Sequence, residues 1–153
     1  MSGQVHQATC VALGGRALLI EGPPGAGKSS LALSLLDRGA ELIGDDGVVL
    51  ERRGDVVWAS PPPNTAGVLE VRNVGLLPWP TVAEAPVALV LRLDPASPRF
   101  VDAPEQVARA GITLPLIRLA PDSPVLALRA EQALVRHGLP VDNAGNHAQS
   151  DER

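Results

Sequence analysis

The sequence is poor in aromatic residues, with two Trp, one Phe and no Tyr among its 153 residues. Proteins that bind single-stranded nucleic acid stack the bases on aromatic side chains, and this chain offers almost no such platform. The formal net charge is −4, and a net negative charge repels polyanions. The composition therefore argues against a protein that binds nucleic acid.

Cysteine and long apolar runs are also scarce. Cys10 is the only cysteine, so the chain can form neither an internal disulfide nor a cysteine-based zinc site. No apolar run approaches the roughly 20 residues of a membrane-spanning helix, and no basic segment followed by an apolar one opens the chain. We therefore expect a cytoplasmic protein from a reducing compartment, without a membrane partner.

The remaining composition is that of a globular domain, with 45% hydrophobic and 20% charged residues. The length suits one domain with a sizeable core. We predict a single domain over residues 1–140. Residues 141–153 are polar and small, which predicts a flexible C-terminal tail.

The spacing of apolar residues predicts an α/β fold with a mixed sheet. Strands are expected at residues 5–13, 17–20, 42–43, 48–50, 56–59, 87–93 and 112–119, the last interrupted by Pro115. Helices are expected at residues 28–38, 104–110 and 125–137, the last with Ser123 as its N-cap. Residues 60–67 contain three consecutive prolines and predict a loop, and residues 69–77 are of mixed character.

Lysine is the rarest charged residue, and the one lysine lies in a recognisable motif. The segment Gly22, Pro23, Pro24, Gly25, Ala26, Gly27, Lys28 and Ser29, here called the glycine-rich loop, fits the pattern G-x-x-x-x-G-K-[ST]. Glycines let successive backbone N–H groups surround a phosphate, and the following helix adds its N-terminal dipole. Lys28 would contact the β- and γ-phosphates, and Ser29 would ligate Mg²⁺. The simpler alternative is a glycine-rich turn beside a solvated lysine.

Two adjacent carboxylates follow the glycine-rich loop at the end of a short apolar strand. Asp45 and Asp46 can divide two tasks, because one can hold Mg²⁺ while the other takes a proton from an attacking hydroxyl. Asp-Asp-Gly is also a common turn between strands, which is the alternative interpretation. Which aspartate would be the base stays open at this point.

These segments resemble the catalytic domain of HPr kinase/phosphorylase. The resemblance rests on residues 22–48 (GPPGAGKSSLALSLLDRGAELIGDDGV) and on residues 69–77 (LEVRNVGLL), which are similar to the family's signature, roughly E-[IV]-R-G-[LI]-G-[IL]. Asn73 stands where the family usually has Gly. His6 lies upstream of the glycine-rich loop, near the position of a histidine in the family's catalytic site. The chain resembles the short, single-domain form of the alphaproteobacterial type.

The resemblance implies a P-loop domain related to phosphoenolpyruvate carboxykinase and a kinase that transfers phosphate from ATP to a serine of HPr. It implies catalytic roles for Lys28, Asp45, Asp46 and His6, and Mg²⁺ ligation by Ser29 and Glu70. Arg72 is a candidate for charge stabilisation. Longer relatives form hexamers, so the resemblance leaves a homo-oligomer open.

Many members of the family also catalyse phosphorolysis of phospho-HPr. Longer members carry a Pro-Gly-Arg-Asn segment whose arginine serves that reaction, and the matching residues 119–124 here contain no arginine. The sequence therefore predicts kinase activity more strongly than phosphorylase activity.

Two other functions remain open from the sequence. A small-molecule kinase fits the glycine-rich loop, although no arginine-rich lid segment is visible. A non-catalytic nucleotide-sensing module fits it as well. Asp94, which follows the apolar run 87–93, could mimic the magnesium-associated aspartate of other P-loop proteins, or could simply end a strand.

Overall fold

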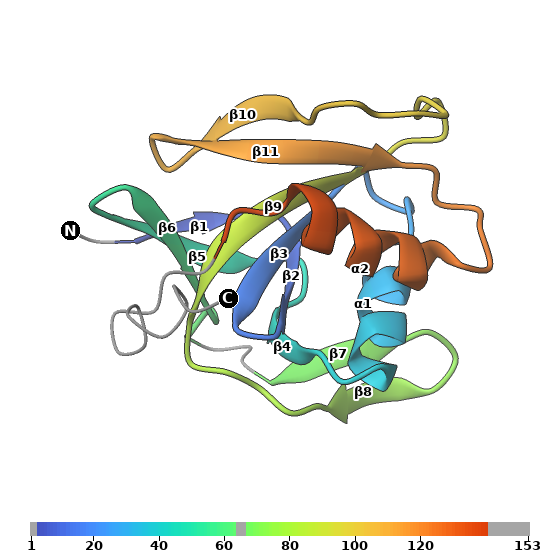
Figure 1. Cartoon of the computed structure of the whole chain (residues 1–153). Coiled ribbons are helices and arrows are strands. Elements are labelled where there is room, and N and C mark those ends of the chain that lie inside the picture. Colours follow the sequence, from blue (N-terminus) through green and yellow to red (C-terminus); the bar gives the residue numbers. More distant parts are fainter. Residues whose placement is uncertain (1–2, 64–66, 141–153) are drawn as a thin grey trace.

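The computed structural model describes residues 3–63 and 67–140, and Figure 1 shows a central β-sheet with two helices beside it. The helices are α1 (Lys28–Asp37) and α2 (Leu126–His137). The strands are β1 (Gln4–His6), β2 (Thr9–Leu13), β3 (Arg16–Glu21), β4 (Glu41–Gly44), β5 (Val48–Arg53), β6 (Val56–Ser60), β7 (Val68–Val71), β8 (Gly75–Pro78), β9 (Ala85–Leu93), β10 (Glu105–Arg109) and β11 (Ile112–Leu119). The predicted tail, residues 141–153, lies outside the described residues.

The sheet is mixed, as predicted, and is organised around β9. This strand runs parallel to β3 on one side and parallel to β11 on the other, while its first two residues pair antiparallel with β6. The remaining pairs, such as β2 with β3 and β5 with β6, are antiparallel. Within the described residues, nine strands form this sheet, and β7 and β8 form a separate antiparallel hairpin.

The alternation of side chains along β3 divides the core between the two faces of the sheet. Leu18 and Ile20 point towards the helices, where they share an apolar cluster with Leu31 and Leu35 of α1. Ala17 and Leu19 belong to the cluster on the opposite face, which contains no helical residue. Both faces of the sheet are therefore covered by buried apolar side chains. This packing fixes the end of β3, where the glycine-rich loop begins. No helix among the described residues is long and apolar enough to cross a membrane.

The predicted strand at residues 5–13 is two strands. β1 pairs with β5 through Val5 and Val49, whereas β2 pairs with β3 and β4, so the chain changes partners between His6 and Thr9. An apolar pattern shows which residues prefer a strand but not which partner each strand chooses, and the break was therefore missed.

The predicted helix at residues 104–110 is wrong, because Glu105–Arg109 form β10. The pairing of Arg109 with Ile112 leaves a two-residue turn in which Ala110 and Gly111 have φ of 51° and 81°. Positive φ at both central positions is the geometry that continues the twist of a hairpin, so pairing with β11 overrides the helical preference of the segment.

Two smaller predictions also need correction. Pro115 does not interrupt β11, because the parallel pairing with β9 begins at Leu116 and a residue without an N–H is tolerated before it. Ser123 is not the N-cap of α2. Val125 is in that position, and the Ser123 hydroxyl accepts a hydrogen bond from the Val125 N–H at 3.1 Å, within the turn that precedes the helix.

Candidate active site

The glycine-rich loop connects the buried end of β3 to the first residue of α1. Gly25 and Gly27 have φ of 81° and 105°, a left-handed conformation that an L side chain adopts only with strain. Gly27 is also the N-cap residue of α1, and no side chain caps the helix there. The first N–H groups of α1 are therefore left without side-chain partners, which is the arrangement that binds phosphate at a helix N-terminus.

Lys28 folds back over the start of the same loop. Its Nζ donates hydrogen bonds to the carbonyl oxygens of Gly22 and Pro23, at 2.9 and 3.1 Å. These bonds hold the ammonium group beside the N–H groups of the loop, so positive charge and hydrogen-bond donors are concentrated at one place. Such a concentration suits an anion with several oxygens.

Asp45, which directly follows β4, is hydrogen-bonded to the glycine-rich loop. The hydroxyl of Ser29 donates a hydrogen bond to Asp45 Oδ1 at 2.7 Å, and the buried hydroxyl of Thr9 donates to the same oxygen at 3.2 Å. Thr9 was missed by the sequence reasoning, because only the pairing of β2 with β4 brings it to the end of β4. Asp45 is half-buried and has a fixed orientation towards Ser29.

Asp46 is held in the tight turn between β4 and β5. Its φ of 63° is left-handed, and its side chain is exposed, unlike that of Asp45. The turn is compact: a Cβ built on Gly44 would clash with the carbonyl oxygen of Gly47. The two aspartates are adjacent in sequence but occupy different environments, since Asp45 is half-buried and Asp46 is exposed.

The β7–β8 hairpin supplies the third part of the site. Glu70 and Arg72, at the end of β7 and just beyond it, both line the same pocket as the glycine-rich loop. The turn of this hairpin contains Asn73 with φ of 73°. Asn tolerates the left-handed region better than other non-glycine residues, which explains how it replaces the usual Gly of the signature segment.

These elements enclose a pocket of about 430 Å³. The pocket is lined by Pro24, Gly25, Gly27, Lys28, Ser29, Ser30, Leu33, Asp45, Asp46, Glu70, Val71 and Arg72. The structure thus brings together every predicted site residue except His6, Gly22, Pro23 and Ala26, the last three being part of the loop itself. The pocket holds three carboxylates and two cationic groups, and all its candidate metal ligands are oxygen atoms.

His6 lies outside the pocket, in a different cluster whose residues come from three strands. Its Nε2 contacts Glu21 Oε2 at 2.7 Å, and Arg109 forms a bidentate ion pair with the same carboxylate, with N–O distances of 2.6 and 2.9 Å. Glu21 is the residue before Gly22, so the cluster fixes the start of the loop. Sequence reasoning missed Glu21 and Arg109, which are 88 residues apart and meet only through the pairing of strands.

Burial and ion pairing have opposite effects on Glu21. Burial alone would raise the pKa of this carboxyl, but the hydrogen bonds from Arg109 and His6 together lower it to about 2. The carboxylate is therefore ionised at neutral pH, and the pKa of Arg109 is correspondingly raised by the hydrogen bond to Glu21. The cluster is a charged structural support rather than part of the pocket.

Asp94 does not reach the pocket either. Its carboxylate accepts hydrogen bonds from the Ala96 N–H at 2.9 Å and from Arg118 at 3.0 Å, which is the pattern of a turn at the end of β9. Arg118, an arginine close to residues 119–124, also forms an ion pair with Glu105 at 2.7 Å.

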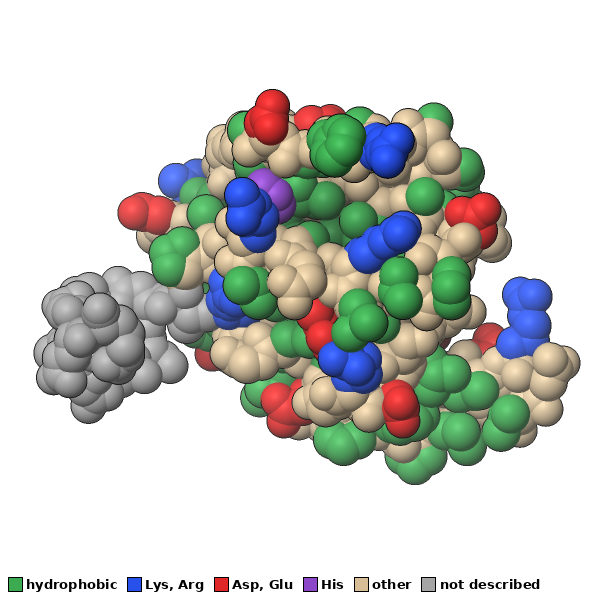
Figure 2. Space-filling model, turned by 45° about the vertical axis from the view of Figure 1, so that its right-hand side comes forward, with side chains coloured by type: hydrophobic (Ala, Val, Ile, Leu, Met, Phe, Trp, Pro, Cys, Tyr) green, Lys and Arg blue, Asp and Glu red, His purple; other side chains and the backbone are tan. Residues whose placement is uncertain are grey.

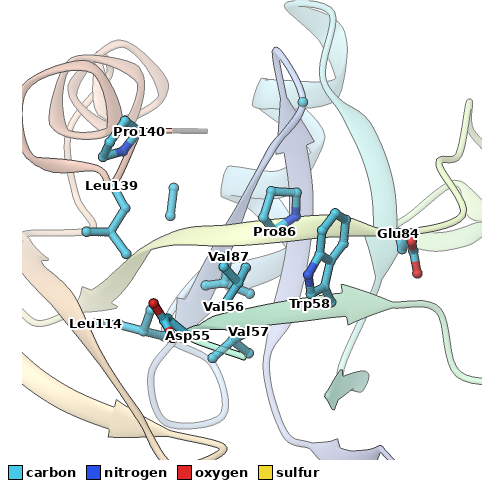
Figure 3. A pocket seen from close by; sticks show the side chains of 12 residues that line it. Asp55, Val56, Val57, Trp58, Glu84, Pro86, Val87, Leu114, Leu139 and Pro140 are labelled. Carbon is cyan, nitrogen blue, oxygen red and sulfur yellow. The ribbon is translucent and has the colours of Figure 1, made fainter. Parts of the chain in front are cut away.

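A second cavity of about 310 Å³ is lined by residues of β6, β9 and β11 and by the segment that follows α2. Figure 3 shows the side chains of Val87, Leu114 and Leu139 around it, with Asp55 and Glu84 among the lining residues. Among the described residues that line the cavity, the charged side chains are the carboxylates of Asp55 and Glu84, which would repel a phosphate.

The fold and the pocket define the class of protein: an α/β domain with a mixed sheet and a pocket built from a glycine-rich loop, paired aspartates and a glutamate. Comparisons with known proteins agree with this class. Residues 2–82 match the family described as HPr Serine kinase C-terminal domain. The chain therefore belongs to the HPr serine kinase C-terminal domain family.

Individual relatives extend the comparison. The chain is 40% identical over 74 residues to "HPr kinase/phosphorylase" of Mycoplasmopsis pulmonis, a match covering 48% of this chain and 24% of the relative. It is 44% identical over 69 residues to the protein of the same name from Burkholderia cenocepacia, covering 44% of this chain and 21% of the relative. These matches thus span about a quarter of the length of the curated relatives.

A solved structure matches almost the whole chain. "Structure of the Hpr(Ser) kinase/phosphatase from Coxiella burnetii" has a TM-score of 0.75 and 27% sequence identity, and the match covers 97% of this chain and 93% of that one. The similarity therefore includes the C-terminal part, residues 83–140, which the family match does not reach.

Proposed function

We propose that this protein is an ATP- and Mg²⁺-dependent serine kinase whose substrate is an HPr-like phosphocarrier protein. The observation that carries the proposal is the convergence of Lys28, Ser29, Asp45, Asp46 and Glu70 on one pocket. The family to which the chain belongs and the printed names of its relatives support the choice of HPr. ATP as donor and HPr as acceptor fit a cytoplasmic enzyme.

The donor set of the pocket fits a magnesium ion. Mg²⁺ prefers carboxylate, hydroxyl, water and phosphate oxygens, and three carboxylates facing a triphosphate would repel it without a cation. No three His, Cys, Asp or Glu side chains gather as a preformed metal cage within the described residues. Ser29 and Glu70, near Asp45, would hold the metal together with substrate phosphates, where it would neutralise the phosphate charge.

The chain's own residues divide the remaining work. Lys28 would exchange its two carbonyl partners for the β- and γ-phosphate oxygens, assisted by the loop N–H groups. Asp45 is already bonded to the Ser29 hydroxyl, so we assign it to the metal side of the site. Asp46, with its exposed carboxylate, would then be the general base that faces the incoming hydroxyl.

In the proposed transfer, the serine oxygen of the acceptor forms a bond to the γ-phosphorus. The bond between that phosphorus and the β–γ bridging oxygen breaks, ADP leaves with the bonding electron pair, and Asp46 receives the hydroxyl proton. Arg72, which lines the pocket, would stabilise the charge on the transferred group. His6 is assigned no step, because its partner in the structure is Glu21.

We do not propose phosphorolysis. The arginine that longer members of the family use for it has no counterpart in residues 119–124, and nearby Arg118 forms ion pairs with Glu105 and Asp94.

The test is a phosphotransfer assay with the purified protein, Mg²⁺, γ-labelled ATP and HPr from the same source. We expect label on wild-type HPr and none on an HPr whose acceptor serine is replaced by alanine. Lys28→Ala should bind ATP weakly and transfer nothing. Bound ATP with unlabelled HPr would instead favour the small-molecule kinase or the nucleotide-sensing module, and normal transfer by Lys28→Ala would overturn the site.

A further inference from the structure

The outward face of the β7–β8 hairpin has an unusual composition for a surface beside a phosphate pocket. In its register, Val68 pairs with Pro78 and Glu70 pairs with Leu76, so these four side chains lie on one face. Leu76 is 71% exposed and Val68 is 37% exposed, and Val74 in the turn is 67% exposed. We call this apolar surface of Val68, Val74, Leu76 and Pro78 the hairpin face.

The opposite side of the hairpin already accounts for its folding. Leu69 is fully buried and belongs to the same apolar cluster as Leu31 and Leu35 of α1. The base of the hairpin is closed by a hydrogen bond from the Trp79 N–H to the carbonyl oxygen of Gly67, at 3.1 Å. The exposed side chains of the hairpin face therefore contribute little to the stability of the fold.

The hairpin face is continuous with the pocket. Glu70 lines the pocket, and its direct cross-strand neighbour is Leu76, whose Cβ is expected within about 5.5 Å. Hydrophobic side chains line the lower edge of the molecule in Figure 2, the end at which Figure 1 shows β7 and β8. An exposed apolar group this close to a charged pocket would contact any molecule that covers the pocket.

We propose that the hairpin face is the docking surface for the acceptor protein, which would present its serine hydroxyl from an apolar patch of its own. The inference rests on the proposed kinase function. A hydroxyl that reaches Asp46 must enter the pocket, and a folded protein carrying it must also cover the rim beside Glu70. A second copy of this chain seated permanently on the hairpin face would cover Glu70 and obstruct the pocket, so the transient acceptor is the better occupant.

The test compares Leu76→Ser with Val135→Ser, which removes an apolar side chain of similar exposure (69%) from α2. The steady-state assay uses labelled ATP and varied HPr. We expect Leu76→Ser to raise the KM for HPr by about tenfold or more, as for a central interface residue, with the Kd for Mg·ATP and kcat retained. Val135→Ser should match the wild type. Val74→Ser should also raise KM, by a smaller factor.

The outcomes separate the two proposals. If wild-type protein labels HPr and Leu76→Ser keeps the wild-type KM, the docking surface is wrong while the kinase function stands. If Leu76→Ser changes the sedimentation mass without changing KM, a second copy occupies the face and the docking proposal is overturned. If wild-type protein binds ATP but labels no HPr, the kinase function and the docking proposal fall together.

Discussion

Ser29 and Asp45 are joined by a 2.7 Å hydrogen bond between the Ser29 hydroxyl and Asp45 Oδ1. The bond connects the first turn of α1 to the end of β4, two elements whose relative position is otherwise set by packing. Because Thr9 donates to the same oxygen, Asp45 is restrained from two sides. The acidic part of the pocket is therefore positioned relative to the glycine-rich loop before any nucleotide enters.

The first prediction tests this connection with Ser29→Ala. Loss of the hydroxyl removes one restraint on Asp45 and one proposed Mg²⁺ ligand, so the Mg²⁺ concentration needed for half-maximal transfer should rise about tenfold. Ser34→Ala is the matched control, because the exposed Ser34 hydroxyl donates a hydrogen bond to the Ser30 carbonyl oxygen of its own helix, outside the pocket. An unchanged Mg²⁺ requirement for Ser29→Ala would remove Ser29 from the metal site.

The second prediction separates the two aspartates. Asp46→Asn should bind Mg·ATP almost normally but lower kcat by roughly a hundredfold or more, because it removes the proposed base. Asp45→Asn should instead raise the Mg²⁺ concentration needed for half-maximal transfer and weaken the binding of Mg·ATP. Binding is measured by isothermal titration and turnover by phosphotransfer, with exposed Asp37→Asn as control. Full turnover by Asp46→Asn combined with loss in Asp45→Asn would reverse the two roles.

The third prediction concerns the turn that carries both aspartates. A Cβ on Gly44 would clash with the backbone oxygen of Gly47, so Gly44→Ala must displace the backbone and should destabilise the fold by about 2 kcal/mol or more. A Cβ on Gly47 has its nearest neighbour at 3.8 Å, so Gly47→Ala is a matched control three positions away. Urea unfolding measures both, and equal stability of the two variants would contradict the turn geometry.

The sequence predicted the glycine-rich loop, the paired aspartates and most strands, because each is a local pattern. Closely spaced glycines, a lysine before a helix and apolar runs such as residues 87–93 are visible without knowledge of the fold. Contacts between strands that are far apart in the sequence cannot be seen in this way. Thr9 reaches Asp45 and Arg109 reaches Glu21 only because particular strands pair, and a periodic pattern does not specify its partner.

The same distinction explains the errors. Residues 105–109 have helical preference, yet they form a strand because β11 offers a partner across a two-residue turn. His6 was predicted in the catalytic site from its position upstream of the loop, and the structure pairs it with Glu21 instead of placing it at the pocket. Its catalytic role stays a prediction that the geometry does not support.

The fourth prediction uses Asn73 in the turn between β7 and β8. At φ of 73°, Asn73→Gly removes the cost of a left-handed side chain and should leave stability equal or slightly higher. Asn73→Ala keeps a Cβ without the local hydrogen bonding of Asn. It should therefore lower the free energy of unfolding by about 1 kcal/mol. Urea unfolding measures the difference, and an alanine variant as stable as the glycine variant would contradict the left-handed conformation of this turn.

The last prediction follows from the low pKa of Glu21. Its carboxyl has an ordinary pKa of 4.5, which burial would raise, but hydrogen bonds from Arg109 and His6 lower it to about 2 in the folded state. A lowered folded pKa stabilises the fold above the unfolded value of 4.5, and this contribution is lost as the pH falls towards 2. At pH 7, Glu21→Gln should therefore cost about 2 kcal/mol, less than the full shift implies because Arg109 is partly exposed.

Urea unfolding at pH 7 and at several pH values below 4.5 checks both the size and the sign. The stability difference between wild type and Glu21→Gln should shrink steadily as the pH is lowered, because the wild-type carboxylate then takes up its proton. Glu84→Gln breaks an exposed ion pair with Arg53 and should cost less than about 1 kcal/mol at any of these pH values. A Glu21→Gln deficit that grows with acidification would show that the buried ion pair does not stabilise the start of the glycine-rich loop.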